Sequence, residues 1–371
     1  MPTVYLHVGM PKTATTALQN FLPLNNKLLN TMGFDYPDMP FHFEGVSPVR
    51  NGHFLTFWNS RKKHPEWSKG IELIEKSFKK HPNVILSDES LWSRQRIEKF
   101  WHNIKRVFKK MGVSIKVIVY LRRQDEQLES HWNQKVKNSP VSLPTSFDDY
   151  LSGGGYAYMP FEYDKALDRI AARIGKDNLI VRVYDRRRFV GGTIFSDFLN
   201  ALGLEWSDDF QLLPYTSNVR LPNNAVEIKR IANPLFYKKD ENYDFYCDAI
   251  SDAFGMELMK DRPRADTTMF SPQQREEFMA RYNEGNAYVA REYLDRDDGI
   301  LFEDDPNTLP EWKYDDKEMM EDTVRILAAA DTYIFRQQEE MTRKLAQINE
   351  ALPVLMYNKL TGHKAHNREE A

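Results

Sequence analysis

Short apolar runs alternate with amphipathic segments through the first half of the chain. Four runs, at residues 4–8, 83–87, 115–121 and 178–184, have the length and composition of buried strands. Between and around them, apolar residues recur at the helical spacing of three and four. This pattern predicts helices over residues 15–32 with an interruption near Pro23, and over 70–81, 97–111, 122–134, 147–151, 161–174 and 195–202.

The alternation of strands and helices is typical of a parallel sheet covered by helices on both faces. We therefore predict an α/β fold with three layers. From residue 218 onward the pattern becomes helical, with segments at 224–233, 271–294 and 318–352. Ser271 and Gln274 flank Pro272 in the arrangement of a capping box, which marks the start of the second of these segments.

We predict one domain over residues 1–352, followed by a C-terminal tail over 353–371 that is polar from residue 361. Two parts of this domain depart from the strand–helix alternation. Residues 34–67 form a proline-containing insertion without a clear period, and residues 218–352 form a helical subregion. An insertion of this length near a binding site is a natural substrate-facing element.

Composition restricts the class of protein. The net charge of −3 provides no general positive field for nucleic acid. The single cysteine, Cys247, permits no disulfide within the chain and is expected to be an inert thiol. The sequence shows neither a signal peptide nor an apolar run of the ~18 residues that a membrane span requires. A cytoplasmic protein with no integral membrane segment is the expectation, and the sequence assigns no oligomeric state.

An anion site is predicted directly after the first strand. Gly9 and Pro11 favour a turn, Lys12 adds a positive charge, and a helix begins within the next few residues. The first N–H groups of a helix lack intrahelical acceptors and carry positive potential, so they bind phosphate or sulfate. The loop is not a Walker A motif, because only two residues separate Gly9 from Lys12 and no glycine precedes that lysine.

Other polar side chains follow the remaining predicted strands. Asp88 and Glu89 come after the second strand, Arg122 after the third, and Tyr184 ends the fourth. Ligands of parallel α/β sheets bind beyond the carboxyl ends of the strands. We therefore expect these residues and Lys12 to lie along one edge of the sheet.

Two stretches carry a resemblance to a known family. Residues 7–19 (His-Val-Gly-Met-Pro-Lys-Thr-Ala-Thr-Thr-Ala-Leu-Gln) resemble the 5′-phosphosulfate loop of PAPS-dependent sulfotransferases, in their bacterial, carbohydrate-sulfotransferase-like form. Ala14 stands where glycine is usual. Residues 119–122, with Ser130 eight residues after Arg122, resemble the 3′-phosphate element. With looser similarities between them, the resemblance covers about residues 1–300 and implies a P-loop-like fold.

The resemblance also implies binding roles. The 5′ end of PAPS is expected to bind Gly9, Pro11, Lys12, Thr13, Ala14, Thr15 and Thr16. The 3′-phosphate is expected to bind Arg122 and Ser130, and the nucleotide to contact Tyr184. Lys12 would stabilise the charge on the leaving oxygen, and the product would be PAP. No metal is implied. The acceptor is expected to be a small molecule or a glycan, with a carbohydrate hydroxyl as the first choice.

The base that activates the acceptor hydroxyl has three candidates. Glu89 is preferred because sulfotransferases acting on glycans often have a glutamate after this strand, while Asp88 and His53 are alternatives. Neighbouring carboxylates raise each other's pKa, which suits a base. Two other functions stay open at this point, namely a nucleotide-dependent phosphotransferase and a non-catalytic binding protein on the same fold.

Overall fold

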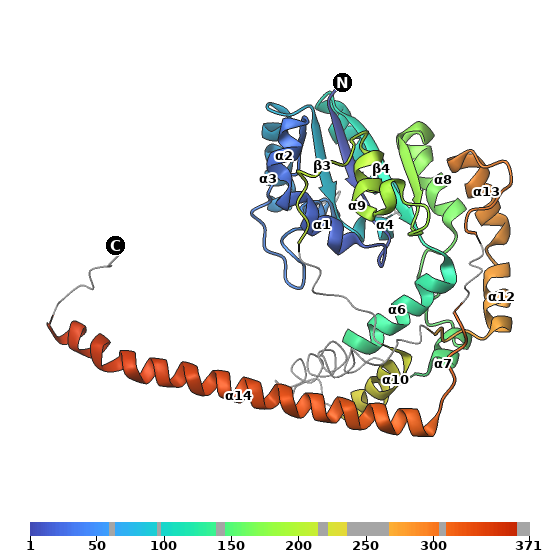
Figure 1. Cartoon of the computed structure of the whole chain (residues 1–371). Coiled ribbons are helices and arrows are strands. Elements are labelled where there is room, and N and C mark those ends of the chain that lie inside the picture. The colour runs from blue at the N-terminus through green and yellow to red at the C-terminus, as the bar shows by residue number, and fades with distance from the viewer. Residues whose placement is uncertain are drawn as a thin grey trace. The chain divides into compact units, whose positions relative to one another are not determined.

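A five-stranded parallel sheet lies within the first of the two compact units into which the structure divides (Figure 1). The structure is a computed structural model, and it describes residues 1–58, 64–94, 98–138, 145–213, 222–235, 267–303 and 309–361. The first unit comprises Met1–His131, Tyr150–Ser217 and Phe270–Thr308, and the second comprises Trp132–Asp149, Asn218–Met269 and Leu309–Ala371. The expectation of one domain over 1–352 stays a prediction, and Cys247 lies outside the described residues.

The strand order of the sheet is β2-β3-β1-β4-β5, and each neighbouring pair is parallel. The strands are β1 Thr3–His7, β2 Phe34–Asp35, β3 Asn83–Ser87, β4 Ser114–Leu121 and β5 Leu179–Val183. Strand β1 is central, and its last residue, His7, lies opposite Ser87 and Ile118. The loops that follow β1 and β3 therefore leave the sheet at the same edge.

Each face of the sheet has its own apolar core, because successive side chains of a strand point to opposite faces. Val4 and Leu6 of β1 belong to one core, and Tyr5 belongs to the other. Helices α3, α5, α8 and α13 supply side chains to the first core, and α1, α2 and α9 to the second. The predicted three-layer α/β fold with a parallel sheet is confirmed.

Most helices begin and end close to the predicted positions, but the last one continues to Thr361 rather than ending at residue 352. Their bounds are α1 Thr15–Leu24, α2 Asn26–Thr31, α3 Pro65–Phe78, α4 Ser90–Ser93, α5 Glu98–Lys110, α6 Gln124–Asn138, α7 Phe147–Ser152, α8 Tyr163–Ile174, α9 Ile194–Ala201, α10 Asn223–Ala232, α12 Pro272–Ala280, α13 Asn283–Leu294 and α14 Asp316–Thr361. Short 3₁₀ helices are η1 His53–Phe57, η3 Lys176–Asn178, η4 Val190–Gly192 and η5 Asn233–Leu235.

Three other local predictions differ from the structure. The helix predicted over 70–81 already begins at Pro65, a residue favoured in the first turn, before the periodic part. The segment 271–294 has the predicted capping box but divides into α12 and α13. The insertion contributes edge strand β2, which is too short, at two residues, to show a period.

In the second unit, helix α10 packs against α14 (Figure 1). Asn224 of α10 joins the two segments through its side chain. Its Nδ2 donates to Asp322 Oδ2 over 2.8 Å, and its Oδ1 accepts from Trp312 Nε1 over 2.6 Å. No named strand follows β5 in the ranges that the structure describes, so the predicted helical C-terminal third is confirmed there.

Candidate active site at the carboxyl edge of the sheet

The loop between β1 and α1 is a tight turn with three left-handed residues. Gly9, Lys12 and Ala14 have φ angles of 21°, 70° and 56°. A Cβ at Gly9 would lie 2.3 Å from Thr15 Cγ2, so only glycine permits this close approach. Ala14, directly before α1, costs about 1 kcal/mol relative to glycine in this conformation. The position at which the resemblance departs from the usual glycine is therefore one where glycine is physically favoured.

Donors from the loop itself, from the residue after β4 and from α6 hold the loop carbonyls. Thr13 Oγ1 donates to Met10 O over 2.6 Å. Gln127 Nε2 donates to Pro11 O over 2.7 Å, and Arg122 Nη1 donates to Lys12 O over 3.0 Å. Because these carbonyls already have donors, the first-turn N–H groups of α1 are the backbone groups that suit an anion.

The three threonines of the loop differ in their surroundings. Thr13 is buried and bonds within the loop. Thr15 is also buried, and its Oγ1 donates to Glu89 Oε2 over 2.7 Å. Thr16 is exposed. Of the three predicted hydroxyl donors, only Thr16 therefore faces solvent, and Thr15 connects the loop with the end of β3.

Two carboxylates follow β3, and their environments differ. The side chain of Asp88 has no exposed surface. Its oxygens accept hydrogen bonds from Arg50 Nε and Nη2 over 3.0 and 3.1 Å, and Oδ2 lies 2.9 Å from His53 Nδ1. Glu89 is 31% exposed, with Oε1 3.5 Å from Arg50 Nη1. The two adjacent acids are thus a buried ion-pair partner and an accessible carboxylate.

Arg50 contacts both carboxylates, and it is not among the residues predicted from the sequence. It lies in the insertion three residues before His53 and is only 14% exposed. No motif surrounds it. Its position in the long insertion near the predicted site was the only signal that could have indicated it.

The pKa of Asp88 is shifted downward, whereas a raised pKa was expected for a base. Burial alone would raise this pKa. The hydrogen bonds and charges of His53 and Arg50 lower it by more than burial raises it, so that the pKa of Asp88 lies below its ordinary value. The predicted rise from a neighbouring carboxylate does not occur at Asp88. Burial lowers the pKa of His7 to about 4, against a smaller opposing effect of the Asp88 charge, so His7 is neutral at pH 7.

The Asp88→Asn variant is expected to be less stable than the parent by about 3 kcal/mol at pH 7, because it leaves Arg50 without its buried counter-charge. A carboxylate with a depressed folded-state pKa stabilises above its unfolded value of about 4, and this stabilisation is lost as pH falls through the folded value. The difference between the two proteins should therefore shrink below pH 4. Urea unfolding at several pH values measures it, with Asp208→Asn at an exposed site as control. Equal stability of Asp88→Asn and parent at pH 7 would contradict this role.

Arg122 and Tyr184 meet, as their positions after neighbouring strands predict. The Arg122 guanidinium lies 5.7 Å from the centre of the Tyr184 ring, and its Nε lies 3.1 Å from Glu126 Oε2. Tyr163 donates its hydroxyl to Arg122 O over 2.7 Å, which fixes the backbone at the end of β4. Ser130 lies six residues beyond Gln124, about 9 Å further along α6, and is half-buried.

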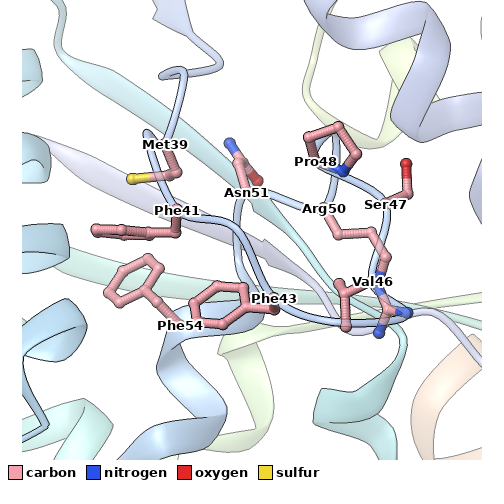
Figure 2. A pocket seen from close by; sticks show the side chains of 9 residues that line it. All are labelled: Met39, Phe41, Phe43, Val46, Ser47, Pro48, Arg50, Asn51 and Phe54. Carbon is pink, nitrogen blue, oxygen red and sulfur yellow. The ribbon is translucent and has the colours of Figure 1, made fainter.

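The insertion surrounds His53 with aromatic side chains. The His53 ring lies 5.1 Å from that of Phe43 and 5.5 Å from that of Phe57. A small pocket in the same segment has Phe41, Phe43 and Phe54 on one side and Arg50 on the other (Figure 2). Its volume of about 10 Å³ holds at most one water molecule, so this pocket is not an acceptor site as it stands.

Over the described residues, no group of three or more His, Cys, Asp or Glu side chains is arranged to hold a metal ion. Within the same ranges, none of the helices combines the length and the apolar character needed to cross a bilayer.

Comparisons with known proteins give three findings. No family model matches the chain. It is 28% identical over 191 residues to an uncharacterized protein of Archaeoglobus fulgidus, a match over 51% of this chain and 48%, or about half, of that protein. A crystal structure of a sulfotransferase from Alicyclobacillus acidocaldarius aligns with a TM-score of 0.38 and 15% identity, covering 63% of this chain and 94% of that one. At these values neither similarity assigns a function to this chain.

Proposed function

We propose that this protein is a PAPS-dependent sulfotransferase that transfers the sulfuryl group to an acceptor hydroxyl, with a carbohydrate as the favoured acceptor class. The observation that carries the proposal is the hydrogen bond of 3.0 Å from Arg122 Nη1 to Lys12 O. It brings together the two elements that resemble the 5′-phosphosulfate and 3′-phosphate sites. PAPS has two separate anionic ends, and a donor of this kind requires two adjacent cationic sites.

Two features of the loop fit an anionic group. The close approach at Gly9 leaves backbone, with no side chain, at the turn. Beneath it, His7 is fully buried and its Nε2 has no hydrogen-bond partner, although Nδ1 lies 2.8 Å from Ser87 Oγ. Buried polar atoms in proteins nearly always have partners, so an orphaned nitrogen under the loop favours a ligand or ordered water there.

Bound PAPS would supply an activated sulfuryl group. In the proposed reaction, the acceptor oxygen forms a bond to sulfur while the bond from sulfur to the bridging phosphate oxygen breaks. Lys12 and the first-turn N–H groups of α1 stabilise the charge that grows on that oxygen, and Arg122 binds the other phosphate through its planar fork. Positioning and electrostatics carry most of such a transfer.

Glu89 is the proposed base, and the structure supports it over both alternatives. Its side chain is 31% exposed and contacts the loop through Thr15, so an acceptor beside the loop can reach it. Asp88 is fully buried and its pKa is lowered, which makes it a poor proton acceptor. His53 directs Nδ1 to Asp88 and packs between two phenylalanines. Asp88, Arg50 and His53 are proposed to position Glu89.

Nucleotide binding tests the donor assignment. PAP is expected to raise the melting temperature by several degrees at saturation, and AMP, which lacks the 3′-phosphate, by much less. Arg122→Ala should remove this difference, whereas Lys109→Ala, which removes an exposed positive charge elsewhere, should preserve it. Stabilisation by ATP–Mg²⁺ and not by PAP would refute the proposal and favour a phosphotransferase. Transfer from labelled PAPS to a panel of sugars, lipids and phenols then tests the acceptor class.

A further inference from the structure

Helix α14 presents an apolar seam to solvent. Between residues 320 and 348, apolar side chains recur at alternating intervals of four and three, interrupted only at Asp331 and Gln338. Six of these side chains are between 54% and 66% exposed, and Ile334 is half-buried. The seam consists of Met320, Val324, Leu327, Ile334, Met341, Leu345 and Ile348.

This seam is distinct from the face of α14 that packs within its own unit. The buried residues Met319, Asp322, Ile326 and Ala329 lie near the start of the helix, where α10 contacts it. At 100° per residue they lie about 120° around the axis from the seam. The contact with α10 therefore does not cover the seam.

We propose that the seam pairs with the same seam of a second copy of this chain, as an antiparallel coiled coil. The spacing averages 3.5 residues, which is the coiled-coil period, and it is kept over four heptads. A fully polar face would need no partner, whereas a largely exposed apolar stripe of this length, polar at only two of its nine positions, marks an interaction surface. The proposal does not depend on the proposed function.

The area available matches what a stable dimer requires. Together with the neighbouring Phe335, which is 62% exposed, the seam contains eight apolar side chains. At about 100 Å² each they supply about 800 Å² per helix, which is what a stable interface takes from one partner.

Charge favours the antiparallel arrangement. Residues 316–333 contain five acidic and two basic residues, whereas 334–350 contain three of each. Parallel pairing would bring the two acidic halves together and would place both Asp331 carboxylates in one layer of the seam. Antiparallel pairing sets each acidic half against a balanced half and separates those carboxylates.

The mass of the full chain in solution tests the pairing. Sedimentation at about 50 μM is expected to give roughly twice the 43.6 kDa of one chain. Leu345→Glu should weaken association by about 100-fold or more, because it removes a leucine that the proposed dimer would bury and adds a charge to the seam. Gln347→Glu adds the same charge in the same turn but off the seam, and should stay dimeric. Helix content by circular dichroism confirms that both variants are folded.

Two outcomes would overturn the pairing: a parent protein of 43.6 kDa at this concentration, or equal masses for Leu345→Glu and Gln347→Glu. Flotation of a monomeric parent with anionic vesicles would assign the seam to a membrane surface instead. Orientation is tested separately in a Cys247→Ser background. Val324→Cys mixed with Leu345→Cys should cross-link across the dimer, because antiparallel pairing of the seam places these two positions opposite each other. Faster cross-linking of Val324→Cys with itself would refute the antiparallel arrangement.

Discussion

Replacement of Lys12 by methionine is expected to lower the turnover of PAPS by about 100- to 1,000-fold, the effect of removing one group that stabilises developing charge. Methionine keeps an unbranched stem at a residue whose φ is 70°, so the change removes the ammonium with little effect on the loop. Single-turnover rates with labelled PAPS measure it. Binding of PAP should change by less than about tenfold, because Arg122 and the first-turn N–H groups remain.

The matched control for Lys12→Met is Lys109→Met, which removes a positive charge at an exposed site on α5. This variant should retain the activity of the parent. If Lys12→Met and Lys109→Met turn over PAPS equally fast, the leaving-group role of Lys12 is wrong.

The second large effect is expected at Glu89, where replacement by glutamine should lower kcat by about 100- to 10,000-fold, the range of general base catalysis. Glutamine has nearly the same shape, and its carbonyl oxygen can still accept the hydrogen bond from Thr15 Oγ1. The loss should therefore appear in kcat, while PAP binding and the melting temperature change little. Activity assays and PAP titrations on the same preparations separate these quantities.

Two further variants define what a loss at Glu89 means. Glu72→Gln, on an exposed position of α3, should have full activity and serves as the matched control. His53→Gln should retain more activity than Glu89→Gln, because His53 is proposed to act through Asp88. If His53→Gln has lower activity than Glu89→Gln, His53 and not Glu89 is the base.

Adjacent residues show where sequence reasoning reached its limit. Asp88 and Glu89 are both acidic and both follow β3, so the sequence offered them as equivalent candidates. In the structure Asp88 has no exposed surface and its pKa is lowered, while Glu89 is accessible beside the loop. The difference arises from Arg50 and His53, which lie 35 or more positions earlier in the chain.

Ser130 and the insertion are two further cases in which the sequence alone could not establish a residue's position or role. Ser130 was paired with Arg122 through the resemblance of residues 119–122 and 130 to a 3′-phosphate element, and its role stays a prediction. Residues 34–67 have no period, so neither the edge strand β2 nor the position of Arg50 could be inferred from them. By contrast, the turn at Gly9 was predictable, because glycine and proline act on their own backbone.

By itself, the sequence determined the four longer strands, their parallel arrangement, and a loop with Lys12 after the first strand. These features depend on local periodicity and on backbone preferences, and both are determined by residues close together in the chain. The tertiary structure alone decided that Arg122 reaches the carbonyl of Lys12, that Thr15 contacts Glu89, and that Arg50 and His53 engage Asp88. Burial, ion pairing and pKa depend on residues distant in the chain, so no local pattern contains them.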